Sequence, residues 1–126
     1  MAAMSDMTYR RLGDSGLTVS TVGLGCNNFG IKLTAEQSSA VVDAAVDNGI
    51  TLFDTADSYG DSEQRLGAAL VGRRDDAIIA TKFGNDVRKR GLDNGADWGA
   101  RGSRRYVIRA VESSLRRLQT DWIDLL

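Results

Sequence analysis

Segments with the period of a β-strand and segments with the period of a helix alternate along the chain, and this alternation limits its fold more than any other feature. Short apolar runs that suit strands lie at residues 21–25, 50–54 and 77–82, and "DWIDLL" at 121–126 predicts a fourth strand. Strands that alternate with helices are typical of parallel βαβ units with right-handed crossovers. The pattern by itself leaves two architectures open, a closed barrel and an open doubly wound sheet.

Three segments between these strands carry the signals of helices. The first begins with a capping box at Thr34 and Gln37, and Gly49 is placed to end it. The second begins near Ser62 and the third near Ser103. The apolar residues of the third share one face at helical spacing: Ile108, Val111, Leu115 and Leu118. We therefore expect each helix to connect two parallel strands.

The segment before this alternation, residues 8–20, predicts a β-hairpin. Two short extended segments flank a turn at residues 14–16, where a glycine supplies a permissive backbone. A closed barrel needs its bottom covered, so we expect the hairpin at the N-terminal end of the strands, opposite Asp54. Residues 21–126 then hold the first βα units up to the fourth strand, in one domain that spans 1–126.

Composition narrows the partners that the chain can have. It carries 16 Lys and Arg against 17 Asp and Glu, which gives no electrostatic reason to expect nucleic acid, and we interpret short basic clusters such as Arg88-Lys89-Arg90 as solvated surface. No apolar run approaches the roughly 20 residues that span a bilayer, so no membrane role is expected. The single cysteine, Cys26, forms no internal disulfide and no export signal begins the chain, which together favour the cytoplasm.

Three chemically distinct side chains follow the predicted strands. Asp54 ends the second strand, Tyr59 lies in the loop after it, and Lys82 ends the third strand. Because parallel strands end on one face, we expect these groups to meet there. A nearby ammonium favours the phenolate, which makes a phenol a better proton donor, and a carboxylate keeps that ammonium charged. The three residues predict a relay that protonates a carbonyl oxygen, with hydride supplied by a nicotinamide cofactor.

Each of these residues also has a plain structural interpretation. Asp54 suits a turn or helix cap, Tyr59 suits a half-buried loop aromatic, and Lys82 suits a solvated lysine at a strand end. Taken singly, each structural interpretation is the commoner one for its residue type. Their joint arrangement at one face favours the catalytic interpretation.

Four separated blocks of the sequence, in order, resemble the N-terminal part of the aldo-keto reductases. They are "YRRLGDSGLTVSTVGLGCNNFG", "FDTADSYGDSEQRLGAAL", "IIATKFG" and "SLRRLQTDWIDLL", and the resemblance runs from Tyr9 to the last residue. It implies a (β/α)8 TIM barrel whose bottom is closed by the hairpin. It also implies NADPH-dependent reduction of an aldehyde or ketone, a small-molecule carbonyl substrate, by a tetrad of Asp, Tyr, Lys and His.

Three members of that tetrad carry over by resemblance: Asp54, Tyr59 as the general acid, and Lys82. The family's histidine follows a segment that resembles "DWIDLL", and this chain contains no histidine. A whole barrel takes about 250 residues. We therefore expect the N-terminal portion of a barrel, ending at about the fourth barrel strand, a truncated form that holds half a site.

The resemblance also places the loop after the first barrel strand near the nicotinamide end of the cofactor. It implies four cofactor-binding residues: Gly25, Cys26, Asn28 and Asp54. We expect the Cys26 side chain to pack rather than react, because a lone cysteine without an adjacent base gives no thiolate signal. The loop 84–102, which contains Trp98, is expected on the same face, either shaping the substrate pocket or simply solvated.

Two other functions stay open at this point. The chain can be a non-catalytic member of the fold that binds the cofactor as a regulatory subunit, although the three relay residues argue against this. It can also be a fragment that self-associates, because exposed strand edges pair readily with another chain. The absence of a histidine and of the later strands favours this second alternative for the polypeptide alone.

Overall fold

The computed structural model describes residues 6–87 and 98–126 of the chain, so the predicted cluster Arg88-Lys89-Arg90 and much of the loop 84–102 lie outside the described residues. An antiparallel hairpin is formed by β1 (Tyr9–Arg11) and β2 (Thr18–Ser20). A parallel sheet contains β3 (Gly23–Gly25), β4 (Leu52–Asp54) and β5 (Ile78–Ala80). The helices are α1 (Ala35–Asp47), α2 (Ser62–Ala69) and α3 (Arg104–Leu118), with a short 3₁₀ turn, η1 (Arg74–Asp76).

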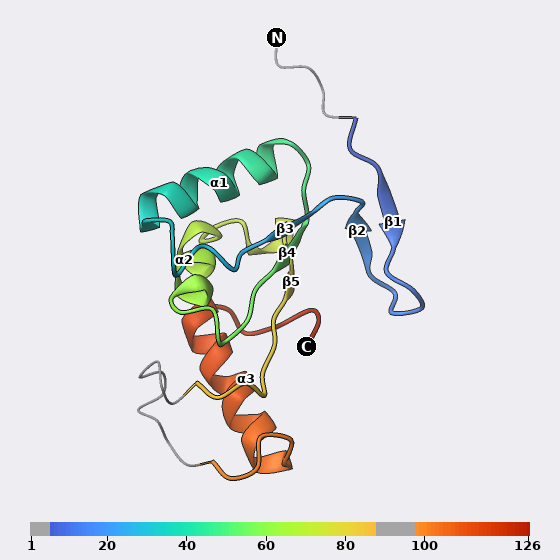
Figure 1. Ribbon diagram of the computed structural model, residues 1–126. Coiled ribbons are helices and arrows are strands. Elements are labelled where there is room, and N and C mark those ends of the chain that lie inside the picture. Colours follow the sequence, from blue (N-terminus) through green and yellow to red (C-terminus); the bar gives the residue numbers. More distant parts are fainter. Residues whose placement is uncertain (1–5, 88–97) are drawn as a thin grey trace.

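The parallel sheet has β4 in its centre. Asp54 is in register with Gly25 on one side and with Ala80 on the other, so the three strands end together. Figure 1 shows α1 and α2 on one side of these strands and the hairpin on the other, with α3 below. The expected alternation of parallel strands and helices is confirmed. We call the edge where β3, β4 and β5 end the carboxyl edge.

The predicted capping box starts α1. Thr34 Oγ1 accepts a hydrogen bond from the Gln37 amide at 3.1 Å, and Gln37 Oε1 accepts one from the Thr34 amide at 2.9 Å. After the helix, Gly49 has a φ of +82°, a left-handed conformation that glycine adopts without steric cost. Its carbonyl accepts a hydrogen bond from the Tyr9 hydroxyl at 2.9 Å, which ties the end of α1 to the hairpin.

One hydrophobic core lies between the sheet and the helices. Phe53 of β4 and Ile79 of β5 are 0% exposed, and they share a buried cluster with Val42 of α1, Leu66 of α2 and Leu118 of α3. Burying a side chain of this size contributes roughly 1.5–3 kcal/mol. The core therefore holds all three helices against the sheet. None of the helices within the described ranges is long and apolar enough to cross a membrane.

The hairpin lies at the end of the sheet away from Asp54, as expected. The Ser20 amide donates to Thr51 Oγ1 at 2.9 Å, and the Thr51 amide donates to Ser20 Oγ at 2.9 Å. Thr51 immediately precedes β4, whereas Asp54 is the last residue of that strand. The hairpin thus joins the N-terminal end of the parallel sheet.

The buried face of α3 differs from the predicted one. Ile108 is 47% exposed, and the buried residues are Tyr106, Ala110, Ser113, Ser114 and Leu118. At its C-terminal end α3 packs closely on α2, since a Cβ on Gly67 of α2 would lie 2.5 Å from the Leu118 carbonyl oxygen. The face that α3 buries consists largely of small residues, and part of its apolar stripe stays at the surface.

The segment 121–126 also differs from the prediction. It is not a regular strand, because its pairing with β5 is a single parallel bridge between Ala80 and Leu125. The Asp124 side chain takes a place in the ladder, since its Oδ2 accepts a hydrogen bond from the Ile79 amide at 2.9 Å. A carboxylate thus occupies a position where a continuous fourth strand would place a backbone carbonyl.

Arg74 fixes this segment to the rest of the fold. Its guanidinium lies 2.9 Å from Asp124 Oδ2, and the two side chains are only 14% and 12% exposed. It also donates to the Trp122 carbonyl at 3.0 Å, and its central carbon lies 4.2 Å from the centre of the Trp122 ring. One arginine therefore holds both the acid and the aromatic residue of the final segment.

Candidate active site

The three predicted relay residues come together at the carboxyl edge. Lys82 Nζ forms an ion pair with Asp54 Oδ1 and donates to the Thr55 carbonyl at 2.8 Å. The same ammonium lies 5.1 Å from the centre of the Tyr59 ring. This meeting depends on strand register, because Asp54 is paired with Ala80, two residues before Lys82. The Asp54 carboxylate, the Lys82 ammonium and the Tyr59 phenol therefore lie together at this edge, as the sequence predicts.

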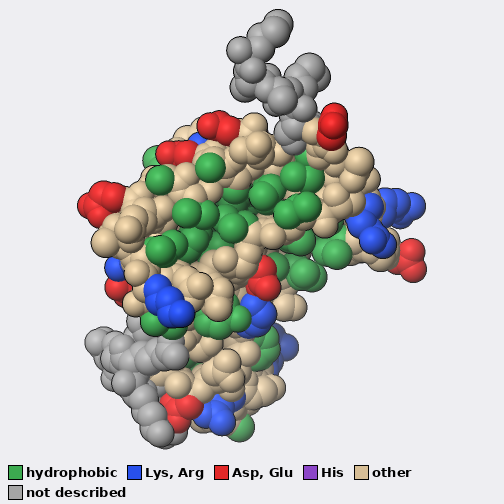
Figure 2. Space-filling model, turned by 45° about the horizontal axis from the view of Figure 1, so that its top comes forward, with side chains coloured by type: hydrophobic (Ala, Val, Ile, Leu, Met, Phe, Trp, Pro, Cys, Tyr) green, Lys and Arg blue, Asp and Glu red, His purple; other side chains and the backbone are tan. Residues whose placement is uncertain are grey.

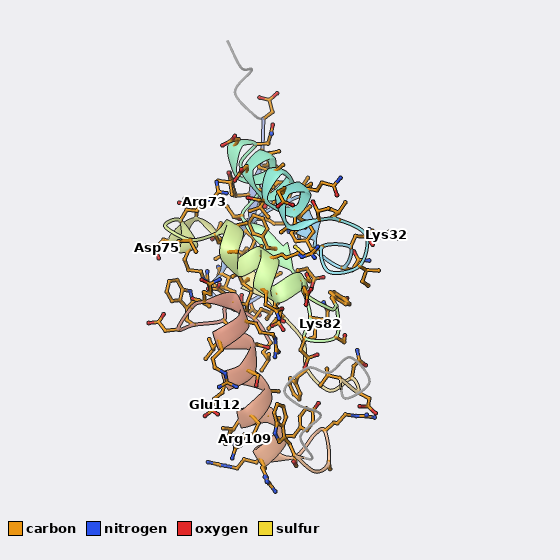
Figure 3. All side chains as sticks on the ribbon, turned by 90° about the vertical axis from the view of Figure 1, so that its left-hand side faces the viewer. Lys32, Arg73, Asp75, Lys82, Arg109 and Glu112 are labelled. Carbon is orange, nitrogen blue, oxygen red and sulfur yellow. The ribbon has the colours of Figure 1, made fainter. Side chains whose placement is uncertain are left out.

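This group is open to solvent. The side chains of Lys82 and Asp54 are 48% and 52% exposed. Figure 3 shows Lys82 and Lys32 on one side of the molecule and Arg73 and Asp75 on the opposite side, where β5 begins. A ligand can therefore approach the charged pair at the carboxyl edge without displacing the core.

Several effects act on the Lys82 ammonium. Partial burial by itself disfavours the charge, but the hydrogen bond and the negative charge of Asp54, together with Tyr59, outweigh it and raise the pKa of Lys82 above its ordinary value. Lys82 is therefore a cation throughout the physiological range.

The loop that carries Tyr59 is tied to the strand ends by backbone hydrogen bonds. The Asp57 amide donates to the Lys82 carbonyl at 3.1 Å, which joins the loop to the residue after β5. The Tyr59 amide donates to the Ala56 carbonyl at 3.2 Å, and the Ser62 amide donates to the Tyr59 carbonyl at 3.1 Å. These short-range bonds fold the loop tightly and lead it directly into α2.

Below the charged group lies a buried layer of hydroxyls. Ser62 Oγ donates to the Cys26 carbonyl at 2.6 Å and lies 2.8 Å from Thr55 Oγ1, and both Ser62 and Thr55 are 0% exposed. The start of α2 is thereby bonded to the residues that follow β3 and β4. Sequence reasoning interpreted Ser62 only as a helix start, because nothing local marks its distant partners.

A buried ion pair completes this layer. Glu63 is 1% exposed, and its Oε1 accepts from Arg117 at 3.0 Å while its Oε2 accepts from Thr81 Oγ1 at 3.1 Å. The carboxylate therefore connects α2, α3 and the residue before Lys82. Sequence analysis missed this pair, since its two members are 54 residues apart.

The loop after β3 lies beside Asp54, where the cofactor is expected. The Cys26 amide donates to the Asp54 carbonyl at 2.8 Å, and Gly25, Asn27 and Asn28 are exposed. A Cβ on Gly25 would meet only Asn27 Oδ1, at 3.9 Å, so the backbone there is open. Exposed amides and an open backbone suit a neutral ligand that forms hydrogen bonds.

Cys26 is the exception in this loop. Its side chain is 0% exposed within the core cluster. Burial, and to a smaller degree the charge of Asp54, raise the pKa of its thiol to about 12. The expected packing of this side chain is confirmed, and its backbone amide is bonded to the residue that ends β4.

Aromatic rings lie beside the Tyr59 loop. The Trp98 and Tyr106 rings meet edge to face with centres 5.5 Å apart, and the Phe83 ring is 6.5 Å from Tyr106. Asn85 connects this cluster to the loop, because its Nδ2 donates to Ser58 Oγ at 3.2 Å. Trp98, at the described end of the loop 84–102, thus packs near the start of α3.

Comparison with known proteins gives a consistent picture. Residues 21–126 match the model of the Aldo/keto reductase family. The chain is 42% identical over 121 residues to the uncharacterized oxidoreductase YqkF of Bacillus subtilis (strain 168), a match that covers 94% of this chain and 38% of that protein. It is 34% identical over 128 residues to L-glyceraldehyde 3-phosphate reductase of Escherichia coli (strain K12), covering 94% and 35%. The chain spans a little over a third of the length of these curated relatives.

Two solved structures are similar in fold. A putative aldo-keto reductase from Pseudomonas aeruginosa has a TM-score of 0.78 and 39% identity, covering 95% of this chain and 45% of that one. The holo form of aldo-keto reductase AKR11C1 from Bacillus halodurans has a TM-score of 0.78 and 41% identity, covering 93% and 38%. These neighbours are TIM barrels, which confirms the expected fold, the N-terminal portion of such a barrel preceded by a hairpin.

Proposed function

Because the chain belongs to the aldo/keto reductase family, we propose that it carries part of the active site of an NADPH-dependent enzyme that reduces an aldehyde or a ketone to an alcohol. One observation carries the proposal: a solvent-accessible ammonium, Lys82, contacts both the Asp54 carboxylate and the Tyr59 ring. Since the chain spans 38% of its Bacillus subtilis relative, the activity is proposed for a whole protein of that kind.

In this proposal Tyr59 is the general acid. Its hydroxyl donates a proton to the carbonyl oxygen as that oxygen gains negative charge, and the phenol becomes a phenolate. Lys82 stabilises the phenolate, because a positive charge nearby favours the ionised form of a phenol. Asp54 keeps Lys82 charged and oriented through the ion pair. The alcohol product then leaves, and solvent at the open carboxyl edge returns the proton to Tyr59.

Residues at the carboxyl edge fit the nicotinamide ribose end of the cofactor. NADPH, when bound, supplies the hydride. We propose that Asn28 and the Asp54 carboxylate form hydrogen bonds with its neutral amide and hydroxyl groups, and that the open backbone at Gly25 allows a flat ring to approach. Cys26 contributes through its backbone, since its side chain is buried. The preference for NADPH follows from the family resemblance.

The substrate is proposed to be a small carbonyl compound that enters beside the aromatic cluster. Trp98 is half-buried, packs edge to face on the buried Tyr106 ring, and offers apolar ring surface close to the loop that carries Tyr59. We also propose a reducing, cytoplasmic compartment, because the single cysteine is a free thiol.

The test of this function is Tyr59→Phe. It is made in this chain and in a chimaera in which residues 21–126 replace the matching segment of the Bacillus subtilis relative. We expect NADPH binding to persist and aldehyde reduction, measured as loss of NADPH absorbance, to fall by roughly 10²-fold or more, the scale for a lost general acid. Tyr9→Phe, made in this chain and in the same chimaera extended to carry the hairpin 8–20, is the matched control, because Tyr9 lies on the hairpin, away from Asp54. A Tyr59→Phe chimaera that reduces the aldehyde at the parent rate would exclude Tyr59 as the acid.

A second function, self-association of the polypeptide, is supported by an exposed strand. In the described sheet β3 pairs only with β4, and the neighbouring Val22 is 52% exposed. Figure 2 shows hydrophobic side chains gathered in an open band across one face of the molecule. Unpaired strand edges and open apolar surface both favour association. Sedimentation of the isolated chain should therefore give species larger than 13.6 kDa, and a stable monomer would contradict this alternative.

A further inference from the structure

The loop after β3 touches the Tyr59 loop backbone to backbone at Gly30. A Cβ built on Gly30 would lie 2.3 Å from the Tyr59 carbonyl oxygen, 2.3 Å from the Asp61 amide nitrogen and 2.8 Å from the Ser62 amide nitrogen. All three atoms belong to the backbone, so none can rotate away as the end of a side chain would. Gly30 is not among the residues with positive φ. The position requires glycine for space and not for conformation.

The contact is also close when it is measured from the Tyr59 loop. Gly60, the residue after Tyr59, has a φ of +59°, and a Cβ on it would lie 3.0 Å from the Gly30 carbonyl oxygen. Two glycines thus face each other across the contact. The place where the Tyr59 backbone lies is therefore set by how closely the Gly30 backbone approaches it.

Arg65 holds the Gly30 loop in this position. Its guanidinium donates to the carbonyls of Phe29 and Leu33, which flank Gly30 on both sides. Phe29 is 2% exposed, so its ring anchors the loop in the core. Arg65 belongs to α2, which starts directly after the Tyr59 loop, and it lies 3.9 Å from Asp61 at that start. The Gly30 loop and the Tyr59 loop are thereby fastened to the same helix.

We propose that Gly30 is a positioning residue for Tyr59: its missing side chain lets the two loops meet and keeps the phenol beside the Lys82 ammonium. The catalytic meaning of this position rests on the proposed function, whereas the contact itself does not. A methyl group at Gly30 has to push the backbone of residues 59–62 outward. The Tyr59 ring then moves away from Lys82, to whose Nζ it now lies 5.1 Å from ring centre to nitrogen.

The experiment compares three alanine substitutions. Gly30→Ala places a methyl group against the Tyr59 loop. Gly67→Ala is a matched control with the same kind of clash elsewhere, because its Cβ would lie 2.5 Å from the Leu118 carbonyl oxygen, between α2 and α3. Gly102→Ala is the control without a clash, since nothing lies within 4 Å of its Cβ.

The readout is the geometry of Lys82 in the whole chain, which needs no catalytic activity. The chain is labelled at the lysine ε-carbons, and the ring-current shift and the nuclear Overhauser effect between Lys82 and Tyr59 are measured, with Lys32 as the internal reference. Tyr59→Leu defines the Lys82 signal without the ring. We expect Gly30→Ala to move the Lys82 signal to that of Tyr59→Leu and to lose the Overhauser effect, while Gly67→Ala and Gly102→Ala keep both.

Two results would overturn the inference: an unchanged Lys82 signal in Gly30→Ala, or an equal loss of that signal in Gly67→Ala. If Gly30→Ala does not fold, Arg65→Met decides, because it releases the loop without a clash. We expect Arg65→Met to weaken both the ring-current shift of Lys82 and its Overhauser effect with Tyr59. Arg73→Met is the control, because it removes an arginine near α2 that does not hold the Gly30 loop. In the chimaera, Gly30→Ala should lower kcat by about 10²-fold, the scale for a misplacement of about 1 Å. A chimaera with no activity in any form, but with the expected Lys82 signals, would reject the proposed function alone.

Discussion

Two ion pairs at the carboxyl edge of the sheet have the same chemistry and opposite surroundings. The side chains of Lys82 and Asp54 are 48% and 52% exposed, whereas those of Arg117 and Glu63 are 9% and 1% exposed. The open pair has solvent on one side and the Tyr59 ring on the other, so its charges can act on a ligand. The closed pair is surrounded by α2, α3 and Thr81, so its charges act only on the fold.

The difference shows that solvent exposure decides whether an ion pair serves chemistry or stability. An exposed pair contributes about 0–1 kcal/mol to stability, because water screens it. Removing one member of a buried pair costs about 3–5 kcal/mol, since it leaves an uncompensated charge in the interior. Changes in the open pair should therefore affect chemistry, and changes in the closed pair should affect stability.

The largest effect on stability is expected from Arg117→Met. This substitution leaves the Glu63 carboxylate buried without its partner, so the free energy of unfolding should fall by about 3–5 kcal/mol. Urea unfolding followed by circular dichroism measures the loss. Arg109→Met, on the exposed face of α3, is the matched control and should change stability by about 0.5 kcal/mol or less. Equal losses in the two variants would refute the difference between the pairs.

The next effect depends on pH and comes from the buried thiol of Cys26. Burial raises the pKa of this thiol from 9.0 to about 12, so above pH 9 the unfolded chain releases a proton that the folded chain keeps. The stabilising contribution is thus complete below pH 9 and is lost as the pH rises toward 12. Each pH unit in that window should cost about 1.4 kcal/mol relative to Cys26→Ala.

The comparison with Cys26→Ala isolates this thiol from the lysines and tyrosines that also titrate in alkali. Unfolding free energies of both proteins are measured between pH 8 and pH 11. Parallel curves would mean that the Cys26 thiol meets water in the folded protein.

The smallest effect on stability is expected from Lys82→Met, which removes the open pair. The free energy of unfolding should change by about 1 kcal/mol or less, because both side chains are half exposed. Carbonyl reduction by the chimaera should nevertheless fall by roughly 10²-fold or more, at least as much as in Tyr59→Phe. Asp54→Asn should be milder, since Lys82 can stay charged without it. A large loss of stability with normal turnover would reverse the roles of the two pairs.

The open pair was predictable from the sequence and the closed pair was not. Asp54 and Lys82 each follow an apolar run that suits a parallel strand, and parallel strands bring their ends together whatever lies between them. Glu63 and Arg117 instead meet through the packing of two helices. Helical period places a residue on a face, but it does not say which neighbour that face meets, so nothing in the sequence singles out Glu63.

The two errors in the fold have different causes, the size of side chains in α3 and a side-chain hydrogen bond in the final segment. An apolar stripe predicts the buried face of a helix when its neighbour is distant enough for large side chains, but α3 lies close to α2 at Gly67 and buries Ser113 and Ser114. The final segment has the composition of a strand, yet the Asp124 carboxylate bonds to the Ile79 amide in place of a backbone carbonyl. Gly30 gave no signal either, because a glycine in a loop is common and its close contact is a long-range property.

The Asp124 carboxylate also makes the two edges of the sheet unequal. At β5 the Ile79 amide is already bonded to Asp124, which Arg74 holds at 2.9 Å, and the Leu125 backbone is bonded to Ile79 and Thr81, so a foreign strand would have to displace this whole segment to add there. In the described sheet β3 pairs with β4 alone, which leaves its other side without a strand. A polar side chain that occupies a ladder position blocks the pairing of another strand there, as charged residues on natural edge strands do. Wrong partners are thus expected to add to the sheet at β3 and not at β5, where residues 121–126 already lie.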